Sequence, residues 1–321
     1  MRKTVLMLAV LLALSLGLAG CGRIMPQETQ SLCVYATFYP LYALADGVLR
    51  DVPGVTLHCL VAPQDGCLRA YQLSDWDVAL LENDADAVIL GGRGLESFDS
   101  ALLNWGENGP AVAAVLYNQP LYNAGDGTAH NTSAGAETDS HLDGPNPHLY
   151  LSIDGAKRIV ESIGAAMLSL DPVFSDRYLK NAGDAMAALD DLRTRTLEIA
   201  GECAGEPVIL MNEALIYVAQ DYGLSVADWI DRESGTAYYD DELQTCLERL
   251  AVSGARVILI ERQAPQALVR ALEEAGYRVA KMDILSTYRA GEGFGISLDA
   301  QIANARTLQA AFELAREDDL D

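Results

Sequence analysis

The residues that could bind a metal ion or act in catalysis are unevenly represented in this 321-residue chain. It has 46 Asp and Glu residues against 22 Lys and Arg residues, a formal charge of −24, but only four histidines. So large an excess of carboxylates argues against nucleic acid and anionic membrane surfaces as partners. It would suit cations, but the small number of imidazoles limits any metal site built from histidine.

The sequence carries no complete catalytic motif among those we considered. The segment Gly91-Gly92-Arg93-Gly94 follows an expected strand, but it lacks the G-x-G-x-x-G spacing of a dinucleotide site. No Gly-x-Ser-x-Gly nucleophile elbow is present either. We therefore expect a binding protein and not an enzyme.

The cysteines show no Cys-x-x-Cys spacing of the kind found in zinc and redox sites. Cys59 and Cys67 bracket a loop that contains a proline and a glycine, so they are the first candidates for a disulfide. Cys203 with Cys246 is the second candidate pair, and Cys33 would then stay free. Spacing alone does not determine the connectivity.

The N-terminus has the pattern of a secretory signal. Two basic residues precede an apolar run over residues 5–18, which is shorter than the roughly 20 residues of a transmembrane helix. The next segment, Leu18-Ala19-Gly20-Cys21, resembles the lipobox of bacterial lipoproteins, in which the cysteine becomes the lipidated first residue. This resemblance implies a signal peptide at 1–20, a lipid anchor on Cys21 and a tether over 21–31. The protein would then face the periplasm or the cell exterior, where disulfides are permitted.

Short apolar strands alternate with helical patterns along the rest of the chain. In the first half we expect strands at 32–38, 55–61, 85–90 and 112–117 and helices at 41–50 and 74–83. In the second half we expect strands at 207–211, 256–260 and 277–284 and helices at 214–222, 265–275 and 298–315. This alternation predicts an α/β fold with parallel sheets.

A longer helical pattern separates the two halves. It begins at Asp171-Pro172, and proline is favourable at the first position of a helix. Its apolar residues fall near one face. We therefore expect two Rossmann-like lobes, residues 32–170 and 202–321, joined by one long helix over residues 171–201.

Several motifs resemble those of the zinc- and manganese-binding solute-binding proteins of ABC importers, the cluster A-I group. In order, they are similar to the family segments TFYPLY, DPHxWLsP, FHxAFxYFxxxYGL, vEPQ and DPL. The matching residues are 36–42, 146–152, 211–224, 260–263 and 283–285. The resemblance covers about residues 32–315, and it gains its weight from the order and spacing of motifs that are individually weak.

This resemblance implies a function as well as a fold. The linking helix would be rigid, and Zn²⁺ or Mn²⁺ would be coordinated in the cleft between the lobes. The protein would hand the metal to the permease and ATPase of an ABC importer while its lipid anchor holds it at the bacterial cell membrane. We expect a monomer.

The four ligand positions of the family are only partly kept in this chain. His148 and Asp283 match the second and fourth ligands. Arg69 stands at the first histidine position, and Asn212, with Glu213 beside it, stands at the third. A guanidinium stays protonated and has no lone pair for a metal. An amide oxygen suits Ca²⁺ or Mn²⁺ better than Zn²⁺.

Two interpretations of these replacements remain open. In the first, His148, Asp283 and Glu213 form a rebuilt metal site, completed by Glu261 or a histidine of the loop over residues 122–147, with Asn212 as a further weak candidate. In the second, Arg69 pairs with Asp283 across the cleft and takes the place of the metal, because arginine is suited to carboxylate contact. A protein of the second kind would keep the fold but act in adhesion, scaffolding or the binding of another ligand.

Overall fold

The residues described from Leu32 onward belong to one structural unit. In this computed structural model, none of the described helices combines the length and apolar character needed to cross a membrane. Cys21, Cys67 and Arg69 lie outside the described residues. The structure describes residues 31–61, 71–106, 109–119, 121–123, 145–230, 240–285 and 293–318.

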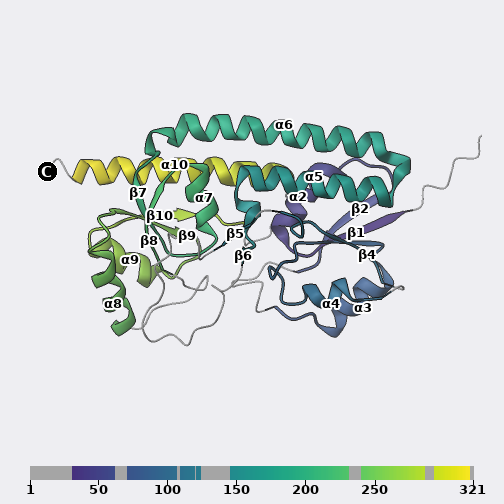
Figure 1. The fold of residues 1–321 in the computed structure, drawn as a ribbon, viewed down its shortest axis with the longest axis horizontal. Coiled ribbons are helices and arrows are strands. Elements are labelled where there is room, and N and C mark those ends of the chain that lie inside the picture. The colour runs from purple at the N-terminus through teal and green to yellow at the C-terminus, as the bar shows by residue number, and fades with distance from the viewer. Residues whose placement is uncertain are drawn as a thin grey trace, which may run out of the picture. The chain divides into compact units, whose positions relative to one another are not determined.

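The first half contains a four-stranded parallel sheet in the order β2-β1-β3-β4 (Figure 1). Alternate residues of its strands belong to two different core clusters, one on each face. Helices α2 and α5 pack on one face, and α3 and α4 pack on the other. The bounds are β1 (Leu32–Ala36), β2 (Val55–Cys59), β3 (Ala87–Leu90), β4 (Ala111–Ala114), α2 (Tyr39–Leu49), α3 (Asp75–Asn83), α4 (Asp99–Leu103) and α5 (Ile153–Leu170).

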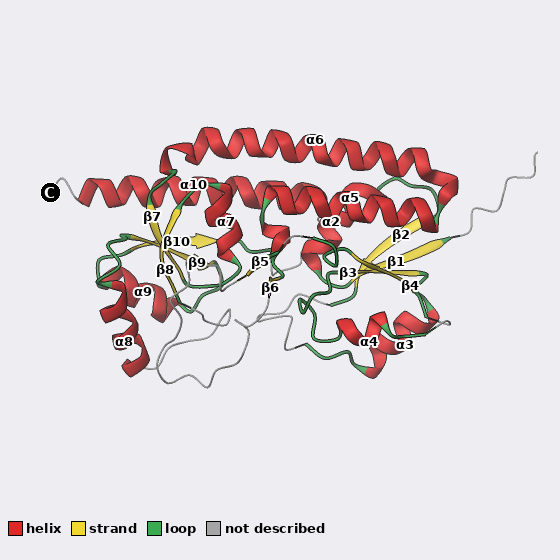
Figure 2. Cartoon of the chain, in the orientation of Figure 1, coloured by secondary structure: helices red, strands yellow, loops and turns green. Residues whose placement is uncertain are grey.

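The second half repeats this plan with a parallel sheet in the order β10-β9-β7-β8. One face packs against α7 and α10, and the other packs against α8 and α9 (Figure 2). The predicted α/β fold with two parallel sheets is confirmed. The bounds are β7 (Pro207–Leu210), β8 (Ser225–Trp229), β9 (Val257–Glu261), β10 (Arg278–Met282), α7 (Leu215–Asp221), α8 (Asp240–Leu250), α9 (Gln266–Glu274) and α10 (Phe294–Asp318).

The long helix predicted between the halves is α6 (Ser175–Ala200), flanked by the 3₁₀ turns η3 (Pro172–Phe174) and η4 (Gly201–Cys203). Its 26 residues span about 39 Å at 1.5 Å per residue. It packs against α5 along one part of its length and against α10 along another (Figure 1). The helix therefore connects the elements of the first sheet with those of the second.

Helix α10 is a second connection that the sequence pattern did not reveal. Its first residue, Phe294, donates its backbone N–H to Asp46 Oδ2 of α2 at 2.8 Å. Near its other end, Asp318 pairs with Arg278 at the start of β10. The helix predicted over residues 298–315 thus begins earlier and ties α2 of the first half to the sheet of the second.

The predicted disulfide between Cys203 and Cys246 is wrong, because both thiols are free. Cys203 packs in the core on the face of the second sheet that α10 covers, whereas Cys246 packs on the opposite face under α8 and α9. The sheet itself therefore separates the two sulfur atoms. Of the other predicted pair, the Cys59 thiol is free and donates to the Val61 carbonyl oxygen at 3.4 Å.

Candidate metal centre

The candidate site residues of the second half follow the carboxyl ends of neighbouring strands. Asn212 and Glu213 come after β7, Arg262 comes directly after β9, and Asp283 comes directly after β10. These three strands are adjacent and parallel. Their carboxyl ends lie at one edge of the sheet, which is where α/β proteins usually bind ligands.

Asn146, at the end of the two-residue strand β6 (Pro145–Asn146), is only 2 % exposed and holds His148 in a defined orientation. Its amide nitrogen donates to the Glu213 carbonyl oxygen at 2.8 Å, so its amide oxygen faces the other way. That oxygen accepts from the His148 backbone N–H at 3.0 Å and lies 2.8 Å from His148 Nδ1. Because an amide oxygen can only accept, neutral His148 carries its proton on Nδ1. The lone pair of the ring is then on Nε2, the atom that would ligate a metal.

Glu213 lies on the Nδ1 side of the same imidazole. Its Oε1 is 3.5 Å from His148 Nδ1, and both side chains are about one-eighth exposed. The carboxylate is therefore placed to polarise the Nδ1–H group of His148. In this position it lies on the side of the imidazole opposite to Nε2.

Hydrogen bonds to its backbone and to one of its side-chain oxygens hold Asp283 in place. Its N–H donates to Asn304 Oδ1 at 2.7 Å, and its carbonyl oxygen accepts from Asn304 Nδ2 at 3.0 Å. Its Oδ1 accepts from the Leu285 N–H at 2.9 Å, which closes a turn. Its Oδ2 is bonded to Arg262 Nη2 at 2.8 Å. The arginine that pairs with Asp283 is thus Arg262, whereas the predicted partner, Arg69, lies outside the described residues.

Asn212 is 6 % exposed, and its side-chain oxygen accepts from the Ala214 N–H at 2.9 Å. This hydrogen bond shapes the turn that leads from β7 into α7. The same oxygen is the atom predicted as a weak metal ligand, and this hydrogen bond uses one of its two lone pairs.

The predicted ligands are only partly brought together. Within the described ranges, no group of three or more His, Cys, Asp or Glu side chains is arranged to hold a metal ion. His148 and Glu213 are in contact, whereas Asp283 pairs with Arg262. Tyr217 of α7, which donates its hydroxyl to the Asn146 carbonyl oxygen at 2.7 Å, is a further positioning residue. It belongs to the motif matched over residues 211–224, but no role was predicted for it.

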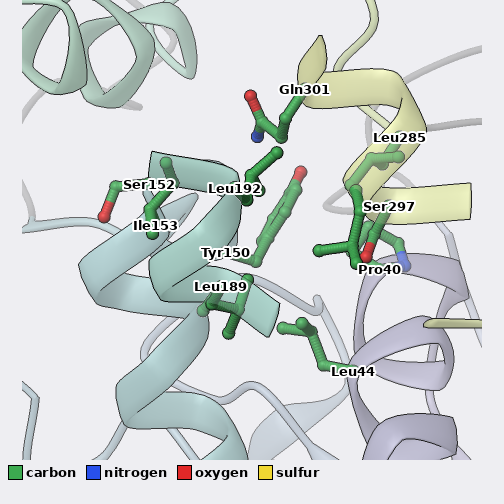
Figure 3. Close-up of a pocket in the computed structure, with 12 residues that line it drawn as sticks. Pro40, Leu44, Tyr150, Ser152, Ile153, Leu189, Leu192, Leu285, Ser297 and Gln301 are labelled. Carbon is green, nitrogen blue, oxygen red and sulfur yellow. The ribbon is translucent and has the colours of Figure 1, made fainter. Parts of the chain in front are cut away.

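A pocket connects the segments that carry His148 and Asp283 (Figure 3). Tyr150 and Leu285, each two residues beyond its candidate ligand, both line it. None of its lining residues is acidic, basic or a histidine, so the pocket is not itself a metal site. The lining residues are Pro40, Leu44, Tyr150, Ser152, Ile153, Ala156, Leu189, Leu192, Leu285, Ser297, Leu298 and Gln301.

Comparisons with known proteins agree with this architecture. The family model described as "Zinc-uptake complex component A periplasmic" matches residues 34–311. The chain is 26 % identical over 225 residues to the high-affinity zinc uptake system protein ZnuA of Bacillus subtilis (strain 168), and the match covers 68 % of each protein.

Two solved structures show the same fold. The solute-binding protein FpvC from Pseudomonas aeruginosa in complex with Mn²⁺ superimposes with a TM-score of 0.74 at 21 % identity, covering 89 % of this chain and 100 % of the other. The Zn(II)-bound ZnuA-like domain of Streptococcus pneumoniae AdcA has a TM-score of 0.69 at 22 % identity, covering 88 % of this chain and 98 % of the domain.

Proposed function

Because the chain belongs to the family of periplasmic zinc-uptake component A proteins, we propose that it is an extracytoplasmic solute-binding protein that captures a divalent metal ion for an ABC importer. The ion is Zn²⁺ or Mn²⁺, as in the names of the relatives and neighbours. Those names do not favour the alternative of adhesion or scaffolding. We assign no enzymatic reaction to the protein.

The orientation of His148 is the observation that carries this proposal. Asn146 fixes the Nδ1–H form of the ring, so Nε2 presents a lone pair without any cost of reorganising the tautomer. Glu213 at 3.5 Å from Nδ1 makes the imidazole a stronger donor to a metal. An oriented and polarised imidazole of this kind is typical of a histidine that binds a metal.

Asp283 is the proposed second ligand through Oδ2, the carboxylate oxygen that Arg262 holds in this structure. Asn304 and the Leu285 N–H fix the rest of the residue, so only this oxygen is left to exchange partners. A nitrogen from His148 and an oxygen from Asp283 are a donor set that both Zn²⁺ and Mn²⁺ accept.

The proposal extends to the cell envelope. Cys21 would carry the lipid anchor, residues 21–31 would form the tether, and the permease and ATPase of the importer would be the partners. Replacing Cys21 by Ser should move the protein from the membrane fraction to the soluble fraction after cell breakage. Equal membrane retention of Cys21→Ser and wild type would contradict the anchor while leaving the metal site untouched.

The metal site is tested by measuring Zn²⁺ and Mn²⁺ dissociation constants of the purified protein by competition with a chromophoric chelator. We expect about one ion per chain, a rise in melting temperature on addition of the ion, and a loss of more than about 100-fold in affinity for His148→Ala, since even outer-shell changes cost 10- to 100-fold. The matched control is His58→Ala, because the exposed His58 ring stacks on Tyr35 of the first sheet. A wild-type protein that binds neither ion, or a His148→Ala variant that binds as wild type does, would refute the proposal.

A further inference from the structure

The pairing of Arg262 with Asp283 is built into the second sheet. Arg262 directly follows β9, and its backbone N–H donates to the Met282 carbonyl oxygen at 2.8 Å, one residue beyond the regular pairing of β9 with β10. This bond brings the side chains of Arg262 and Asp283 to the same edge of the sheet. There the guanidinium Nη2 meets Asp283 Oδ2 at 2.8 Å.

The two partners differ in how firmly they are held. The Asp283 side chain is 17 % exposed, and its backbone and Oδ1 are fixed by Asn304 and Leu285. The Arg262 side chain is 48 % exposed. The carboxylate is therefore the stationary member of the pair, and the guanidinium is the member that can swing into solvent at little cost.

We propose that Arg262 competes with the metal ion for Asp283: its guanidinium neutralises the carboxylate in the metal-free protein, leaves when the ion binds, and returns as the ion departs. This inference rests on the function proposed above. Two cations cannot share one carboxylate oxygen at contact distance without repulsion. Arg262 therefore lowers the affinity for the ion, and it speeds release because the emptied carboxylate has a replacement partner within reach.

The expected size of the effect is moderate. Breaking a half-exposed ion pair changes an equilibrium constant by a few-fold at most. Repulsion between the displaced guanidinium, which stays nearby, and a dication adds a factor of similar size in a solvated setting. Removing the charge of Arg262 should thus tighten metal binding by about tenfold.

The experiment compares Arg262→Gln with wild type in the same chelator competition with Zn²⁺ and Mn²⁺, and follows release by stopped-flow mixing with excess EDTA. The matched control is Arg278→Gln, which removes the same charge from an arginine–aspartate pair at the opposite end of β10. We expect about tenfold tighter binding and slower release for Arg262→Gln, and less than twofold change for the control. Arg262→Lys, which keeps the charge, should bind more weakly than Arg262→Gln.

The outcomes separate this inference from the proposed function. If wild type binds the ion through His148 and Arg262→Gln binds no tighter, Arg262 is not a competitor and the function still stands. If both arginine variants tighten binding equally, a general change of net charge is responsible and the inference is wrong. If neither wild type nor Arg262→Gln binds either ion, the proposed function fails together with the inference.

Discussion

The glycine-rich segment after β3 binds a carboxylate of its own chain, and this makes the stability of the protein depend on pH. Glu96 is 1 % exposed. Its side-chain oxygens accept from the N–H groups of Gly91 and Gly92, both at 2.8 Å, and from the Thr37 hydroxyl at 2.5 Å. A Cβ at Gly91 would lie 3.2 Å from both carboxylate oxygens and would collide with the Leu95 side chain, so this close approach needs glycine.

Burial has the largest effect on the pKa of Glu96. It raises the pKa of Glu96 from 4.5 to about 7, although the three hydrogen bonds favour the charged form and lower it. Between these two values the folded protein holds a proton that the unfolded chain has lost. The contribution of Glu96 to the free energy of unfolding is therefore fully present below about pH 4.5, and it is lost as the pH rises to about 7. The total is about 3 kcal/mol, at 1.36 kcal/mol for each pKa unit.

The perturbation is Glu96→Gln, which removes the titration but keeps the shape. Glutamine stays neutral, as protonated Glu96 does, but it presents an NH₂ group to one of the N–H groups from which the carboxyl oxygen accepted. At pH 4.5 we therefore expect the variant to be less stable than wild type by about 1–3 kcal/mol, the cost of the unsatisfied N–H group. The diagnostic quantity is the stability difference between wild type and variant. It should be about 3 kcal/mol larger at pH 4.5 than at pH 7.5.

The assay is urea unfolding of both proteins at several pH values between 4.5 and 7.5, with chelator present so that metal binding does not contribute. Taking the difference cancels the titration of groups that both proteins share, such as the histidines. Asp221 has a pKa raised by burial to about 6, so the interval from pH 6 to 7 isolates Glu96 most clearly. A difference that stays constant, or grows with pH, would show that Glu96 is charged throughout and would refute the reasoning.

Two further predictions concern the start of helix α5, downstream of His148. Gly155→Ala in α5 would drive a Cβ into the Leu149 carbonyl oxygen, so we expect a loss of more than about 2 kcal/mol in the free energy of unfolding. Its control, Gly183→Ala in α6, meets nothing within 4 Å and should gain about 0.5–1 kcal/mol; equal effects of the two changes in urea unfolding would contradict this account. Asp221 Oδ2 accepts the Ile153 N–H at the start of α5 at 2.6 Å, so Asp221→Ala should cost about 1–2 kcal/mol, and Asp221→Asn, which keeps an acceptor, should cost less. An Asn variant that is as unstable as the Ala variant at pH 7.5 would argue that the charge and not the cap matters.

The elements that the sequence determined most clearly are those with a local cause. The all-buried runs of β3 and β9 and the apolar residues on one face of α6 are explained by burial and periodicity, which depend only on the spacing of residue types. Strand β8 and helices α4, α5 and α8 were not predicted. Strand β8 alternates exposed with buried positions only partly, and its place at the edge of the sheet relaxes the apolar requirement.

The candidate site was predictable only as a set of positions. Motif order placed Glu213 and Asp283 after strands of one parallel sheet, whose carboxyl ends share an edge. The folded chain brings His148 into contact with Glu213 and pairs Asp283 with Arg262. The role of Asn146 followed from neither its type nor its position, because its amide orientation depends on the Glu213 carbonyl oxygen, 67 residues away.

The sequence by itself therefore determined the class of fold, the long linking helix and the residues near which a metal could bind. The motifs also led us to expect an arginine, Arg69, among them. The pairing of β9 with β10 decided which arginine forms the ion pair with Asp283. That register places Arg262 beside Met282 and Asp283. Contacts between distant segments likewise determined the tautomer of His148, and so which of its ring nitrogens bears the lone pair. Spacing along a chain limits what can meet, but the register of the sheet and the direction of each hydrogen bond exist only once the chain has folded.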